Sequence, residues 1–214
     1  MDAIEFRLYA TPVSVYSCKV RLALVLKDLE WTEMAPWGGY GSTAYQAIVA
    51  QGTVPALVHN GFILAESDAI IEYPDDIGAG RPLLPVDPRE RARARALSRF
   101  IDTRLEPAAR ALFAHVGTGQ RVPDDAKALL ARYLTVLQEL AGPGPYLTGA
   151  TPALPDCGLW AVAKVLEMLE HELRLGLPAP ALAGSATQVA CLERVLTAHA
   201  IALQDWAAKR GYKE

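Results

Sequence analysis

Residues 53–73 read TVPALVHNGFILAESDAIIEY and carry the signals for two strands followed by a helix. Thr53–Leu57 and Phe62–Ala65 are short apolar runs, and His59-Asn60-Gly61 separates them. An Asn-Gly pair between two such runs favours a two-residue turn, so we expect an antiparallel hairpin.

The helix after this hairpin has a start signal and a stop signal. Glu66-Ser67-Asp68 supplies capping and acidic first-turn residues for a helix over Ala69–Tyr73. We expect that helix to end at Pro74, because proline has no N–H to donate and its ring crowds the preceding turn.

The chain upstream predicts a β-α-β unit. Ile4–Ala10 is apolar and aromatic and ends at a Thr-Pro pair, which is typical of a short strand before a turn. Ser14–Leu29 is rich in good helix formers and has serines placed as possible N-caps. Glu30–Met34 could form a second strand, and Ala35–Gly41, with its three glycines, reads as a loop. Together with the hairpin and its helix, this predicts an α/β N-terminal domain over residues 1–76.

A second, helical domain is expected after a proline-rich linker. Three prolines and two glycines mark residues 77–88 as the linker, and strand signals nearly vanish beyond it. Residues 89–214 then form the second domain. Its candidate amphipathic helices span 88–116, 124–141, 155–172 and 188–208.

Composition excludes several classes of protein. With 51% hydrophobic and 21% charged residues among 214, the chain has the balance of a folded protein and not of a disordered one. A net charge of −3 gives no basic footprint, so neither nucleic acid nor an anionic membrane is expected as a partner. The first residues lack the pattern of a signal peptide and no long apolar run follows, so we expect a cytoplasmic protein.

The cysteines and histidines are too scattered to suggest a disulfide framework or a metal site. Cys18, Cys157 and Cys191 are odd in number and far apart, so reduced thiols are the default. The histidines show no ligand-like spacing, and we expect no metal. They are His59, His115, His171 and His199.

Four motifs in the right order resemble the glutathione transferase superfamily across nearly the whole chain. They are Ser14 followed by Lys19-Val20-Arg21-Leu22-Ala23-Leu24, Val54-Pro55-Ala56-Leu57, the run from Glu66 to Tyr73, and Leu83-Leu84-Pro85 followed by Asp87-Pro88. The first half is most similar to the serine-type transferases, in particular the zeta class. The resemblance implies a thioredoxin-like N-terminal domain, an all-helical C-terminal domain, glutathione as co-substrate, and a role in detoxification.

The resemblance also assigns candidate catalytic residues. Glutathione's thiol, with a pKa of about 8.5, is mostly protonated at neutral pH, and a hydroxyl at a helix N-terminus stabilises its thiolate. Ser14 falls on the zeta-type catalytic serine, with Ser17 as the fallback donor. Ser14 could instead serve only as a helix cap. Cys18 offers a third reading, a thiol oxidoreductase, but it lies a turn inside the helix, where a buried and inert thiol is expected.

Two further segments are implied to hold glutathione. Val54-Pro55 matches the family segment that carries a cis proline, beside which the backbone of the preceding residue binds the cysteinyl part. Glu66 and Ser67 match the pair that receives the γ-glutamyl end, since a hydroxyl and a helix N-terminus suit a carboxylate while Glu66 suits an ammonium.

The sequence also departs from the family pattern. Val49-Ala50-Gln51-Gly52 stands where Asn-Pro-x-Gly is common, and Val13 replaces the arginine before the zeta serine. The helix-capping Ser/Thr-x-x-Asp motif begins with Ala153, so its hydroxyl is missing. Met168 stands where zeta isomerases carry an arginine for the substrate carboxylate, which argues against a maleylacetoacetate isomerase.

The expected function is therefore glutathione conjugation, isomerisation or dehalogenation of a small hydrophobic electrophile. A non-catalytic binding or interaction protein of the same fold is the main alternative. A homodimer is also expected, with the Glu66–Tyr73 helix of one subunit against early second-domain helices of the other. We assign the apolar residues Leu97, Phe100 and Ile101 to that contact.

Overall fold

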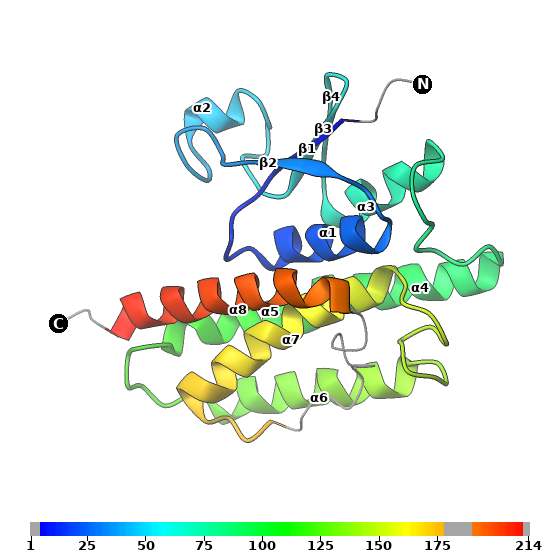
Figure 1. Ribbon diagram of the computed structural model, residues 1–214. Helices are drawn as coiled ribbons and strands as arrows, with labels where there is room; N and C mark the ends of the chain where they lie inside the picture. The colour runs from blue at the N-terminus through cyan, green and yellow to red at the C-terminus, as the bar shows by residue number, and fades with distance from the viewer. Residues whose placement is uncertain (1–4, 178–189, 212–214) are drawn as a thin grey trace. The chain divides into compact units, whose positions relative to one another are not determined.

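The computed structural model describes residues 5–177 and 190–211, and it divides the chain into two compact units, Met1–Leu83 and Leu84–Glu214. Figure 1 shows the elements of each unit. The point of division falls inside the stretch 77–88. The domain limits 1–76 and 89–214 stay a prediction, and each unit is described by itself below.

The first unit is built on a four-stranded sheet. Its strands are β1 (Phe6–Tyr9), β2 (Trp31–Met34), β3 (Ala56–His59) and β4 (Phe62–Ala65), in the order β2-β1-β3-β4. β1 runs parallel to β2 and antiparallel to β3, and β3 runs antiparallel to β4. The predicted β-α-β and ββ-α order is present, and this unit has the thioredoxin-like fold.

The hairpin between β3 and β4 forms where the sequence predicts it. Asn60 and Gly61 have φ angles of 49° and 81°, and positive values at both central residues are those of a type I′ turn. β3 begins at Ala56 and not at Thr53, since Pro55 has no N–H for the ladder.

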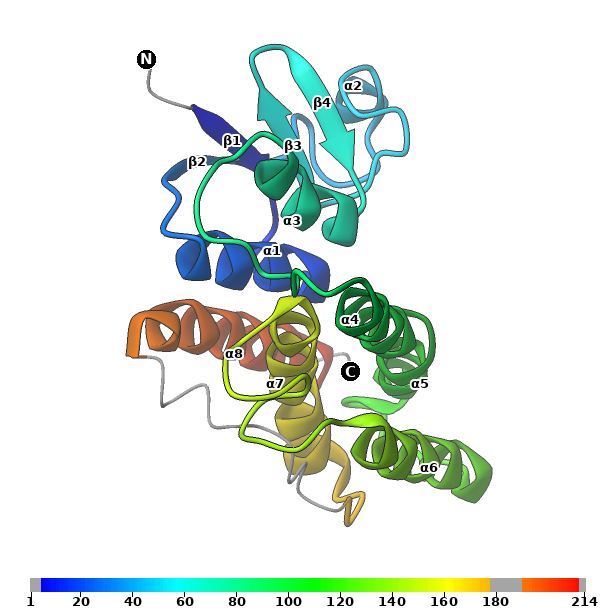
Figure 2. The same cartoon turned by 90° about the vertical axis from the view of Figure 1, so that its right-hand side faces the viewer.

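Helices α1 (Val15–Leu26) and α3 (Ser67–Asp76) lie side by side against one face of the sheet (Figures 1 and 2). Lys19 of α1 and Lys27, the C-cap of the same helix, are both fully buried. The ammonium of Lys19 lies 2.6 Å from a carboxylate oxygen of Asp68, and that of Lys27 pairs with Asp75. These ion pairs fasten the two helices together at both ends of α3.

The expected stop at Pro74 is wrong, because α3 continues to Asp76. The N–H of Ile77 donates to the carbonyl of Tyr73, so the helical bonding resumes beyond the proline. Proline's φ suits a helix, and near the C-terminal end it costs only the bond that its own nitrogen cannot donate.

The second unit is all-helical, as predicted. Its elements are α4 (Pro88–Phe100), the π-helix η1 (Ile101–Leu105), α5 (Glu106–Ala111), the 3₁₀ helix η2 (Leu112–His115), α6 (Asp124–Leu140), α7 (Leu154–Leu173) and α8 (Ala190–Gly211). The helix expected over 88–116 is present as a continuous helical run over 88–115, in which the bonding changes from α to π, back to α and then to 3₁₀. Pro107 cannot donate a helical bond, and the π-turn immediately before it shifts the bonding pattern by one residue. Residues 188–189 of the last predicted helix lie outside the described residues.

Helix α7 forms the centre of this unit and packs against α4, α5 and α8. Two residues that the sequence assigned to a subunit contact point inward instead: Leu97 is 5% exposed and Ile101 is fully buried. Phe100 is half-buried, with its ring edge-on to Tyr133. The helical period places these side chains in the unit's own core, so that argument for a dimer was wrong.

The N-terminus of α7 has half of a capping box. A carboxylate oxygen of Asp156 accepts the N–H of Ala153 at 2.8 Å, and the other accepts the N–H of Leu147 at 2.9 Å. Ala153 has extended N-cap geometry, φ −134° and ψ 179°, but no side-chain oxygen to accept the N–H of Asp156. Burial raises the pKa of Asp156 to about 6, although the backbone N–H donors of Leu147 and Ala153 oppose that rise.

We predict that Ala153→Ser stabilises the protein by about 1 kcal/mol, because the new hydroxyl can accept the N–H of Asp156 and complete the box. Urea denaturation of both proteins measures the change. Ala153→Cys adds a side chain of similar size with a poor acceptor and should not stabilise. Equal gains from both variants would show that filled volume, and not the cap, is responsible.

Asp156 should also make stability depend on pH. Its pKa is higher in the folded chain, about 6 against 3.8, so the folded protein keeps the proton longer and Asp156 contributes less stability as the pH rises from 4 to 6. The loss approaches about 3 kcal/mol. Asp156→Asn cannot titrate, so the wild-type advantage over this variant should shrink between pH 4.5 and 7 in denaturation experiments. An advantage that grows over this range would contradict the assignment.

Candidate functional site

The candidate site segments emerge from one edge of the sheet. Tyr9, Ala56 and Ala65 lie opposite one another in β1, β3 and β4. The segments that adjoin these three residues are the loop to Ser14, the Val54-Pro55 pair and the Glu66-Ser67 pair. The strand register therefore brings together all the segments that the sequence assigned to glutathione.

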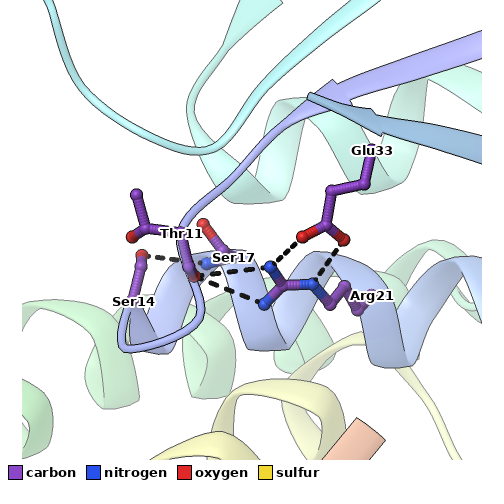
Figure 3. Close-up of polar contacts among 5 residues, drawn as sticks. All are labelled: Thr11, Ser14, Ser17, Arg21 and Glu33. Carbon is purple, nitrogen blue, oxygen red and sulfur yellow. Dashed lines mark hydrogen bonds and ion pairs between the residues drawn. The ribbon is translucent and has the colours of Figure 1, made fainter. Parts of the chain in front are cut away.

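Ser14 is the N-cap of α1. Its backbone is extended, with φ −73° and ψ 119°, and its Oγ accepts the N–H of Ser17 at 3.1 Å (Figure 3). A serine hydroxyl accepts and donates at the same time, so the cap bond leaves the O–H hydrogen for another acceptor. The first turn of α1 contains no acidic residue, so no side-chain charge there offsets the positive potential of the helix end.

Ser17 and Cys18 lie inside the fold. Both residues are fully buried. The Oγ of Ser17 has no hydrogen-bond partner among the described residues. Cys18 forms no disulfide and its sulfur has no solvent access, as expected for an inert interior cysteine, and the same holds for Cys157 in the second unit.

Arg21, which the sequence analysis did not single out, ties the Ser14 loop to the sheet. Its guanidinium binds both carboxylate oxygens of Glu33 in β2, at 2.8 and 2.5 Å. Two of its nitrogens also lie 3.4 Å from the carbonyl oxygen of Thr11 (Figure 3). The same carbonyl accepts the backbone N–H of Ser14 at 3.3 Å. The arginine's hydrogen bond lowers the pKa of Glu33, which keeps this carboxylate charged.

Val54 and Pro55 precede β3 and are joined by a cis peptide bond, as predicted. Both residues are buried. In sequence they lie directly before Ala56, the β3 residue paired with Tyr9. The pair therefore occupies the same sheet edge as the Ser14 loop.

Glu66 and Ser67 begin α3. Glu66 has a φ of 74°, which is rare for a residue with a side chain, and its side chain is exposed. Ser67 is 7% exposed and is the first residue of the helix. The carboxylate of the next residue, Asp68, accepts a hydrogen bond from the buried ammonium of Lys19. The first turn of α3 is thereby anchored to α1. A signal for this anchor is hard to find in sequence, since lysine is seldom buried.

The described residues offer neither a metal-binding cluster nor a membrane-spanning helix. Within residues 5–177 and 190–211, no three His, Cys, Asp or Glu side chains come close enough to hold a metal ion. Over the same described ranges, no helix has the length and apolar character that crossing a bilayer requires.

Comparisons with known proteins identify the family of this chain. The family model described as the glutathione S-transferase N-terminal domain matches residues 8–82. A glutathione S-transferase of Pseudomonas putida is 31% identical over 154 residues, which is 70% of each chain.

Two solved structures are also similar. A bacterial maleylpyruvate isomerase, described as a zeta-class transferase, has a TM-score of 0.66 at 25% identity and covers 88% of this chain and 95% of its own. A maleylacetoacetate isomerase from Methylobacterium extorquens, solved with malonate and GSH, has a TM-score of 0.65 at 26% identity and covers 91% and 96%. The resemblance to zeta-like transferases is thereby confirmed, and the chain belongs to the glutathione S-transferase family.

Proposed function

We propose that this protein activates the thiol of glutathione with Ser14 for conjugation, isomerisation or dehalogenation of a small hydrophobic electrophile. One observation carries the proposal: Ser14 sits at the N-terminus of α1 with its hydroxyl hydrogen available. A thiolate placed there gains one hydrogen bond and the potential of the helix end, and both favour the anion over the thiol.

The rest of glutathione is assigned to the other two segments. The backbone of Val54 pairs with the cysteinyl part, as in the cis-proline segment of the family. The first-turn N–H groups of α3 and the hydroxyl of Ser67 receive the γ-glutamyl carboxylate, and Glu66 faces the ammonium. The anchoring of Asp68 by Lys19 supports this assignment, since it fixes the turn that would hold the carboxylate.

The competing functions have less support. A disulfide exchange reaction at Cys18 requires access to its sulfur, and the residue is fully buried. A non-catalytic binding protein would have no need of the Ser14 hydroxyl. The substitutions of Ser14 described below therefore distinguish this alternative from the proposed enzyme. Met168 is 5% exposed and uncharged, so this position offers no cation for a substrate carboxylate.

The Ser14 hydroxyl is tested by two substitutions. Ser14→Ala should lower kcat about ten- to a hundredfold and raise the pKa of bound glutathione, with little change in glutathione affinity, because the lost bond is worth about 1.5–3 kcal/mol to the anion. Turnover of an aryl halide and the ultraviolet absorbance of the thiolate, each followed against pH, measure both effects. The variant also loses its cap bond and about 1 kcal/mol of stability.

Ser14→Gly separates the two roles, because glycine at an N-cap costs only a few tenths of a kcal/mol and has no side-chain donor. It should keep nearly the stability of the wild type and lose activity as the alanine variant does. Ser17→Ala removes a buried hydroxyl that has no described partner, so activity and stability should change little. Full activity in Ser14→Gly, or its loss in Ser17→Ala, would reject Ser14 as the activating residue.

We also propose a cytosolic homodimer. The first unit exposes Phe62 (49%) and Ile63 (40%), successive residues of the edge strand β4 whose side chains point to opposite faces of the sheet, and a subunit contact that covers this edge would bury apolar area from both. The expected mass by light scattering at micromolar concentration is twice the chain's 23.1 kDa. Phe62→Glu should shift the protein toward monomer. A wild-type monomer would refute the dimer.

A further inference from the structure

Tyr45 packs against Val54, which belongs to the segment assigned to the cysteinyl part of glutathione. It lies in the short helix α2 (Thr43–Gln46) and is fully buried. Its ring packs in a cluster with Val49, Val54 and Ala56, and edge-on to Tyr9 with the ring centroids 5.3 Å apart. This packing places the phenol at the sheet edge where the site segments meet.

The hydroxyl of Tyr45 donates to the backbone carbonyl of Thr53 at 2.9 Å. Burial, and to a lesser degree the phenols of Tyr9 and Tyr40, raise the pKa of Tyr45 to about 12. The hydroxyl therefore stays protonated, and remains a donor, at any pH at which the enzyme works.

The hydrogen bond to the Thr53 carbonyl also fixes the orientation of the neighbouring Val54 N–H. The peptide unit from Thr53 to Val54 is planar and trans, since the cis bond lies one residue further, between Val54 and Pro55. In a trans peptide the C=O and the N–H point in opposite directions. Holding the Thr53 carbonyl toward Tyr45 therefore holds the Val54 N–H away from it.

The segment before Thr53 has few other means of being held by side chains. Val49 and Ala50 stand where the family commonly has Asn-Pro, and neither side chain can form a hydrogen bond. Backbone bonds close the loop instead: the N–H of Gly41 donates to the carbonyl of Gly52 at 3.1 Å, and the N–H of Gly52 to that of Val49 at 2.7 Å. These backbone bonds hold the loop as far as Gly52, and the hydrogen bond from the Tyr45 hydroxyl holds the next residue, Thr53, directly before Val54.

We propose that Tyr45 is a positioning residue for glutathione, which orients the Val54 amide through the Thr53 carbonyl. The inference rests on the proposed function, because it takes Val54 as the backbone partner of the cysteinyl part. In this role Tyr45 does not contact the reacting sulfur. Its loss should weaken binding of glutathione while leaving the activation of the bound thiol unchanged.

Tyr45→Phe tests this, since it removes one oxygen and keeps the ring in the cluster. Calorimetry with S-hexylglutathione, an unreactive analogue, should show a dissociation constant about three- to tenfold higher, as expected for one lost neutral hydrogen bond. KM for glutathione should rise by a similar factor, with kcat at saturation and the pKa of the bound thiol unchanged. Hydrogen exchange should show less protection of the Val54 amide by the analogue than in the wild type.

Tyr73→Phe is the matched control. Tyr73 is a partly buried tyrosine of the same unit, and its hydroxyl bonds His59 at 2.8 Å, so its removal costs a comparable bond elsewhere. This variant should bind the analogue as the wild type does. Equal weakening in both variants, or wild-type affinity in Tyr45→Phe, would overturn the inference and leave the proposed function standing. Failure of the wild type to bind the analogue would overturn both.

Discussion

The register that sets Tyr9, Ala56 and Ala65 side by side in β1, β3 and β4 is the constraint on which the site depends. Because β3 runs antiparallel to its two neighbours, its first residue meets their last residues at one edge of the sheet. A slip of one residue would turn the side chains of a strand to the opposite face and separate these ends. The Asn60-Gly61 turn fixes the register between β3 and β4, since its two positive φ angles are those of a tight two-residue hairpin.

The buried ion pairs between α1 and α3 hold the two helices in a fixed position relative to each other. A fully buried lysine left without its carboxylate costs about 3–5 kcal/mol, so the pairs strongly disfavour a displaced helix. Lys19 acts near the start of both helices, where Ser14 and Ser67 stand, and Lys27 acts at the far end of α1. The two N-termini on which the proposed function rests are thereby kept in a fixed relation within the first unit.

The sequence predicts this unit well wherever a local signal fixes the backbone. Asn60-Gly61 determines the hairpin, and the resemblance around Val54-Pro55 identifies the cis bond. Pro74 misled the predicted end of α3, because a proline near the C-terminal end of a packed helix is tolerated where an isolated helix would stop. The bonds of Arg21 and Tyr45 join residues whose pairing no periodic pattern records, and they become visible only when the chain is folded.

Capping and catalysis need not be rival roles for Ser14. The cap uses a lone pair of the hydroxyl oxygen, and thiol activation would use its hydrogen. The cap bond to the Ser17 N–H also orients the oxygen, which restricts where the hydrogen can point. Donation from the backbone N–H polarises the hydroxyl, and a polarised hydroxyl is a stronger donor toward an anion. The helix terminus that demands a cap therefore also supplies the field and the geometry for a thiolate, so that one serine can answer both requirements.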